Sequence, residues 1–88
     1  MHPAKIELML TPTGRHLASS KEILEMAHVF RRVGGEAGQW QRVAVNARSP
    51  YLDTDVFAPG TLLAYYLQYE TQQGEPAARS HVVSTTLP

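Results

Sequence analysis

Turn-forming residues divide this chain into segments of about ten residues, a spacing typical of consecutive β-strands. Glycine and proline cluster at residues 12–14, 34–38, 49–50, 59–60 and 74–76. Glycine adopts backbone conformations that other residues avoid, and proline has no backbone N–H to donate, so both tend to end regular structure. Turns spaced in this way predict an all-β sandwich or barrel.

Between the turns, apolar side chains recur at every second position, which is the period of a half-buried strand. The pattern is clearest in residues 6–10, 43–45 and 63–70. Val43 and Val45 are expected to face the core. In the longest run we expect Leu63, Tyr65, Leu67 and Tyr69 to be buried. The residues that alternate with them are expected to face solvent, namely Ala64, Tyr66, Gln68 and Glu70.

Residues 20–33 also carry the signals of a helix. Ser19 and Glu22 have the spacing of a capping box, and the apolar residues that follow fall near helical spacing. Gly34 or Gly35 would end such a helix. The alternative fold is therefore α+β, with a helix at 20–33 packed on a four-stranded antiparallel sheet. The consecutive strands expected after Gly34 favour the sandwich, because tertiary pairing often overrides local helical preference.

The length and composition exclude several classes of protein. A chain of 88 residues is expected to form a single domain, residues 1–88. Without cysteine it has no disulfide and no thiolate. Eight basic and eight acidic residues cancel, which argues against nucleic acid as a partner. The basic pair Arg31 and Arg32 is interpreted as a solvated end of a strand or helix. No stretch approaches the ~20 apolar residues of a membrane helix, so no membrane insertion is expected.

Three consecutive stretches resemble parts of a fibronectin type III domain, an immunoglobulin-like β-sandwich. "AHVFRRVGGEAGQWQRVAV" resembles its third strand, glycine-rich hairpin and following strand, and "SPYLDTDVFAPGT" its short strand and proline-glycine corner. "LLAYYLQYETQQGEPAARSHVVSTTL" resembles its last hairpin. With residues 5–14 and 15–23 as the first two strands, the resemblance covers nearly the whole chain. It implies a seven-stranded antiparallel sandwich.

The sequence departs from this family at two positions that usually hold large core side chains. The family's tryptophan late in the second strand is replaced by Ser20 or Lys21. Leu63 stands where the family usually places its corner tyrosine. Each change removes a large buried contact, and the second also removes a hydrogen bond, so the core must be packed differently.

No group of residues has the spacing of a catalytic or metal site. The histidines lack the close spacing of metal ligands. Asp53 and Asp55 could hold a cation loosely, but an aspartate in a turn more often accepts a hydrogen bond from its own backbone. Gly34, Gly35 and Gly38 lack the lysine of a phosphate-binding loop. We therefore expect no enzymatic activity, no catalytic residue, no metal and no cofactor.

The alternation also predicts a candidate binding face. If Ala27 and Val29 are buried, then His28, Phe30 and Arg32 face solvent. In the resembled fold, this strand shares a sheet with the segments around residues 42 and 66. The predicted partner-binding face consists of Phe30, Arg32, Trp40, Arg42, Tyr66 and Gln68. Aromatic residues with arginines are typical of interaction hot spots. The alternative is that these rings pack across strands and only stabilise the sheet.

The sequence thus favours a non-enzymatic module that mediates protein–protein contact or acts as a spacer, binding a protein partner or another copy of itself. One alternative is a carbohydrate-binding or accessory module of a modular enzyme, with Trp40 and Tyr66 stacking on sugar rings. Another is a small virion or appendage structural protein. The chain fits a complete gene product and an excised domain equally well. We expect a soluble chain without a signal peptide and assign no compartment to it, although a larger modular parent would place it outside the cell or in a virion.

Overall fold

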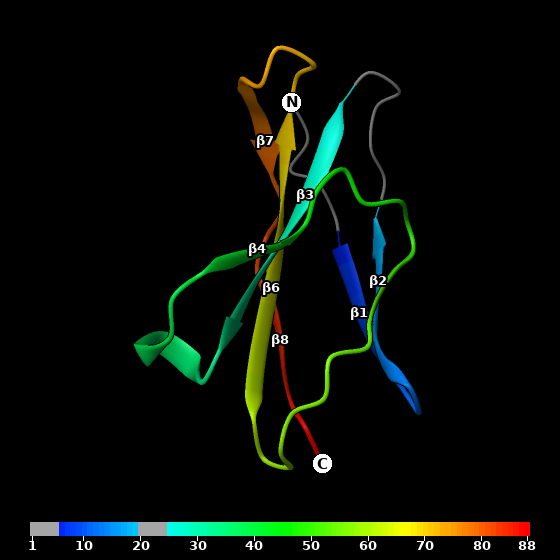
Figure 1. Ribbon diagram of the computed structural model, residues 1–88, viewed down its shortest axis with the longest axis vertical. Coiled ribbons are helices and arrows are strands. Elements are labelled where there is room, and N and C mark those ends of the chain that lie inside the picture. Colours follow the sequence, from blue (N-terminus) through cyan, green and yellow to red (C-terminus); the bar gives the residue numbers. More distant parts are fainter. Residues whose placement is uncertain (1–5, 20–24) are drawn as a thin grey trace.

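The computed structural model describes residues 6–19 and 25–88, which form two antiparallel sheets (Figure 1). The first sheet has the order β1-β2-β5, from β1 (Ile6–Thr11), β2 (Gly14–Ser19) and β5 (Tyr51–Asp53). The second has the order β4-β3-β6-β7, from β4 (Gln41–Ala44), β3 (Met26–Val33), β6 (Leu62–Glu70) and β7 (Pro76–Arg79). The described residues contain one short 3-10 helix, η1 (Gly35–Ala37). The prediction of an all-β fold is confirmed.

The core lies between the two sheets. The first sheet contributes Ile6 and Leu17 to it. The second sheet contributes more, namely Ala27, Val29, Leu63, Tyr65, Leu67 and Tyr69. The predicted burial of one face of β6 is confirmed, because Leu63 and Tyr65 are fully buried and Leu67 and Tyr69 nearly so. Leu63 therefore takes part in the core although it lacks the ring and hydroxyl expected from the resemblance. The expectation that Ala64 faces solvent is wrong: this small residue of β6 lies between the paired strands β3 and β8 (Val83–Thr86) and is only 3% exposed.

The α+β alternative is wrong for the part of residues 20–33 that the structure describes. Met26–Val33 form strand β3, and residues 20–24 lie outside the described residues. All eight residues of β3 are paired with β6, and its middle also pairs with β4. These ladders connect residues far apart in sequence, and they prevail over the local helical signals because they also bury Ala27 and Val29.

A β-bulge in β4 reverses the expected alternation at the end of that strand. Phe30 of β3 is opposite Arg42, but Val29 is opposite Ala44, so Val43 is an extra residue in β4. Ala44 therefore faces inward with Val29. Val45 is consequently turned outward and is 62% exposed, so the expectation that it faces the core is wrong.

The last predicted strand is divided into β7 and β8 (Val83–Thr86), and both pair with β6. The described residues thus contain eight assigned strands where seven were expected. Ser80 lies in the gap and is buried. Its Oγ accepts a hydrogen bond from the backbone N–H of Leu67 at 2.8 Å, and its own N–H donates to the carbonyl of Leu67 at 2.9 Å. This serine replaces the missing ladder contact, so β6 stays satisfied where its neighbour is interrupted.

Candidate functional site

Three aromatic rings meet on the outer face of the second sheet. Phe30 and Tyr66 are directly opposite each other on β3 and β6. Their rings are stacked, with centroids 4.9 Å apart and planes 3° from parallel. Trp40, from the loop before β4, places its ring edge-on to Tyr66 with centroids 4.7 Å apart. Each of the three residues is half-buried, because the rings cover one another as well as the sheet.

Arginines surround these rings. The guanidinium of Arg32 lies over the Trp40 ring at 4.7 Å from its centroid, and that of Arg79 lies over Tyr66 at 4.9 Å. Arg42 is opposite Phe30 and is exposed. Within the described residues, these three arginines make no ion pair. We call this surface the arginine–aromatic face, and it consists of Phe30, Arg32, Trp40, Arg42, Tyr66, Gln68 and Arg79.

The structure therefore brings together the residues that the alternation had placed on one face. Gln68 uses its amide to donate to the carbonyls of Tyr69 at 3.3 Å and Ala78 at 3.2 Å. Arg79 was missed, although it is opposite Gln68 on β7. Arg79 could have been assigned to this face only from the register between β7 and β6. That register decides which residues of the last hairpin share a face with Tyr66.

His28 departs from the expectation that it faces solvent, because it is only 3% exposed. Its Nδ1 accepts a hydrogen bond from the backbone N–H of Asn46 at 3.1 Å, which leaves Nε2 to donate to Glu70 at 3.2 Å. The segment after β4 is held beside β3 by a second bond, from the N–H of Ala47 to the carbonyl of Ala27 at 2.7 Å. His28 therefore has a structural role at the edge of the face.

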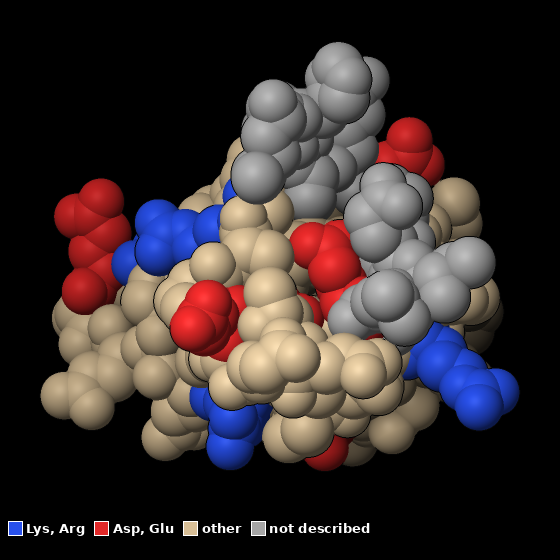
Figure 2. Space-filling view, turned by 90° about the horizontal axis from the view of Figure 1, so that it is seen from above, with Lys and Arg blue, Asp and Glu red and all other residues tan. Residues whose placement is uncertain are grey.

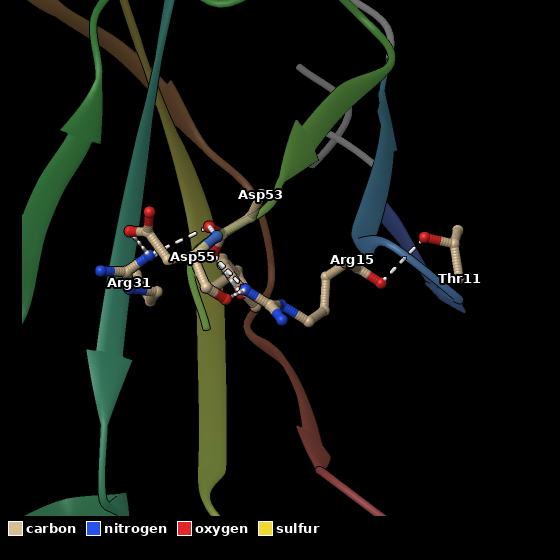
Figure 3. Close-up of polar contacts among 7 residues, drawn as sticks. Thr11, Arg15, Arg31, Asp53 and Asp55 are labelled. Carbon is tan, nitrogen blue, oxygen red and sulfur yellow. Dashed lines mark hydrogen bonds and ion pairs between the residues drawn. The ribbon is translucent and has the colours of Figure 1, made fainter. Parts of the chain in front are cut away.

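A second group of polar residues lies between the sheets, and we call it the inner cluster: Arg15, Arg31, Asp53, Asp55 and Tyr65. Figure 3 shows the two arginines converging on the two aspartates from different strands. Arg15 and Asp53 belong to the first sheet, and Arg31 and Tyr65 to the second. Arg31 Nη1 lies 3.0 Å from Asp53 Oδ2 and 2.8 Å from Asp55 Oδ2, whereas Arg15 Nη2 lies 3.3 Å from Asp53 Oδ2. The cluster thus joins the sheets through charge.

The Tyr65 hydroxyl completes this cluster. It donates to Asp53 Oδ2 at 2.5 Å and accepts from Arg15 Nε at 3.0 Å. Asp53 Oδ1 also accepts the backbone N–H of Asp55 at 3.2 Å, which confirms the expected hydrogen bond to its own turn. Burial raises the pKa of Asp53, and hydrogen bonds from Tyr65 and Arg31 lower it. The combined lowering effects are larger, so the pKa of Asp53 lies below its usual value. Burial, together with the bond to Asp53, raises the pKa of Tyr65.

The inner cluster is a structural network in which the buried charges are paired with one another. Both oxygens of Asp53 are occupied, and Phe57 covers the two guanidinium groups, with its ring centroid 5.5 Å from Arg15 Cζ and 4.9 Å from Arg31 Cζ. The interpretation of Arg31 as a solvated residue is wrong, because β3 turns it inward with Val29. The two-residue period of the strand already predicts this inward orientation, because Arg31 is two residues after the buried Val29.

A surface groove of the described structure involves neither of these two groups. It lies between β1 and β8 and is lined by Leu8, Met9, Leu10, Val83, Ser84 and Thr85, none of which is ionisable at neutral pH. Residues 6–19 and 25–88 contain no cluster of three or more histidine, aspartate or glutamate side chains placed to bind a metal ion. In the same residues, no helix has the length and apolar character needed to cross a membrane.

Comparison with known proteins does not assign the chain to a family. No family model matches it, and searches of curated proteins and of solved structures gave no significant match. Its function must therefore be inferred from the two groups of residues described above.

Proposed function

We propose that the chain is a non-enzymatic interaction module whose arginine–aromatic face docks a protein partner. The single observation that carries this proposal is the meeting of Phe30, Trp40 and Tyr66 on one sheet surface, bordered by arginines without ion-pair partners in the described structure. Tryptophan, tyrosine and arginine are the residues most enriched in interaction hot spots. A charged rim around an aromatic centre is also the usual anatomy of a docking surface.

The arrangement of strands supports a fibronectin type III-like sandwich as the scaffold of this module. If β7 and β8 are treated as one interrupted strand, the sheets have three and four strands, the division expected from the resemblance. In such a scaffold, the arginine–aromatic face is the solvent side of the four-stranded sheet. The inner cluster then supplies the contact between sheets that the replaced tryptophan and corner tyrosine would otherwise supply.

The carbohydrate-binding alternative is less well supported by the ring geometry. A sugar stacks on an open aromatic face, but one side of the Tyr66 ring is covered by Phe30 and Arg79 lies over the ring as well. Arg32 lies over the Trp40 ring in the same way. The rings therefore form a packed base for the surrounding arginines, and they are not arranged as a stacking platform for sugars.

A selection experiment tests this proposal. The chain is used to select ligands from a display library of peptides and small folded fragments, and each ligand is then measured against Trp40→Ser and Met9→Ser. Met9 is 63% exposed on β1, in the other sheet, and so serves as a matched control. We expect Trp40→Ser to weaken binding by roughly 30-fold, the loss typical of a hot-spot residue, and Met9→Ser to leave it unchanged. Ligands that bind both variants equally would contradict the proposal.

A further inference from the structure

We infer that the partner of the arginine–aromatic face is an acidic, extended polypeptide segment. This inference rests on the proposed docking function and specifies its chemistry. The chain as a whole has no net charge, but its charges are not evenly distributed. Arg32, Arg42 and Arg79 lie together on one face, and Glu70, the acidic residue two positions after Gln68 on β6, is bonded to His28 at 3.2 Å.

Seen from above, the molecule has acidic and basic side chains interspersed over its surface (Figure 2). In the inner cluster, likewise, every arginine has a carboxylate partner. The arginine–aromatic face differs because its three arginines have no carboxylate partner among the described residues, so their charge is available to a ligand.

The stacking of the guanidinium groups favours carboxylates as the ligands. A guanidinium that lies flat on an aromatic ring is held in position while its N–H groups, which lie in its own plane, point to the side. Carboxylates match this fork with two parallel hydrogen bonds. The guanidinium groups of Arg32 and Arg79 lie over Trp40 and Tyr66, with Cζ 4.7 Å and 4.9 Å from the ring centroids. The Nε of Arg32 is buried without a hydrogen bond in the described structure, so it is not a donor that a ligand can reach.

The spacing of the arginines favours an extended segment lying across the strands. Arg42 and Arg79 belong to β4 and β7, which lie at opposite ends of the order β4-β3-β6-β7. Three strand intervals separate them, or about 14 Å at the usual spacing between strands. An extended chain covers this distance in about four residues. A short segment with two or more separated acidic side chains can therefore reach both ends of the face.

The same charges disfavour a second copy of this chain as the occupant. A two-fold dimer through this face would place Arg32, Arg42 and Arg79 opposite the same residues of the other copy. Like charges in direct opposition destabilise an interface. Single-stranded nucleic acid is also anionic, but it is bound through bases stacked on open aromatic faces, and Phe30 and Arg79 cover the Tyr66 ring.

Titration with defined probes tests this inference. Trp40 is the single tryptophan of the chain and lies within the face, so its fluorescence reports occupancy directly. The probes are a glutamate-rich peptide of about ten residues, which spans the face when extended, a lysine-rich peptide of the same length, and a thymidine oligonucleotide. We expect only the glutamate-rich peptide to change the fluorescence, and salt to weaken its binding.

Charge reversal provides the decisive variants. Arg42→Glu with Arg79→Glu should weaken binding of the glutamate-rich peptide roughly tenfold or more, whereas Arg48→Glu, the same change at an exposed loop position outside the face, should not. Tighter binding of the oligonucleotide, or equal binding of the two peptides, would overturn the inference. Selected ligands that depend on Trp40 but are not acidic would overturn it too, although the docking function would stand. Ligands independent of Trp40 would instead refute the docking function itself.

Discussion

Arg31 and Arg32 are neighbours in sequence, and the fold places them in opposite environments. Arg31 points between the sheets and pairs with Asp53 and Asp55, whereas Arg32 points outward and lies on Trp40. The same division separates Tyr65, which is fully buried, from Tyr66, which packs on the outer face. In each pair, the inward residue bonds a carboxylate of the chain. The outward residue makes no such bond in the described structure and packs on an aromatic ring instead.

The largest effect should come from removing the carboxylate of the inner cluster. Asp53→Asn would leave Arg15 and Arg31 partly buried without their shared charge partner, at a cost of about 3–5 kcal/mol in the free energy of unfolding. Asp55→Asn is the matched control, because the Asp55 side chain is 64% exposed, and it should cost no more than about 1 kcal/mol. Urea unfolding measures both, and equal losses would show that the inner cluster is not the contact that joins the sheets.

A smaller effect separates the two adjacent tyrosines. Tyr65→Phe keeps the ring but removes the hydroxyl that bonds Asp53 and Arg15, so it should cost about 1–3 kcal/mol. In Tyr66→Phe the stacked ring is kept and no described hydrogen bond is lost, so the change should stay within about 0.5 kcal/mol. Thermal or urea unfolding of the two variants side by side tests the inward and outward assignment. A reversed order would mean that the register of β6 is wrong.

Acid should weaken the inner cluster. The pKa of Asp53 is lowered in the folded state, so its carboxylate stabilises the fold above the unfolded-state pKa, and this contribution is lost as pH falls through the folded-state value. Stability should therefore decline below about pH 4. Tyr65→Phe removes one of the bonds that lower this pKa, so the loss of stability in acid should be smaller in this variant and should level off at a higher pH. Urea unfolding from neutral to acid pH measures both curves, and coincident acid limbs would contradict the role given to the hydroxyl.

The smallest effect on stability is expected on the outer face. Arg42→Glu changes an exposed side chain with no ion pair in the described structure, so the free energy of unfolding should shift by no more than about 0.5 kcal/mol. Binding of the glutamate-rich peptide should nevertheless fall. Calorimetric melting and the fluorescence titration, made on the same sample, separate the two quantities. A large loss of melting temperature would instead assign Arg42 a structural role.

The sequence predicted the features that depend on local alternation. Inward Leu63, Tyr65, Leu67 and Tyr69 followed from the two-residue period, and so did the outward positions of Phe30 and Tyr66. It did not predict the bulge at Val43, because a bulge is visible only when β4 is set against β3. The burial of Arg15 depends in the same way on its partners, since Asp53 and Tyr65 are distant in the chain and only the pairing of sheets brings them together.

Ser80 has a consequence for how this fold tolerates change. Because its hydroxyl takes the place of a ladder bond to Leu67, the strand that contains it can be interrupted without leaving β6 unsatisfied. Arg79, immediately before this break, is therefore on a short segment of its own. We expect the last hairpin to accept insertions or deletions at its tip while β8 remains paired with β6. Under the proposed docking function, such changes would alter the surroundings of Arg79 and leave the protein's interior as it is.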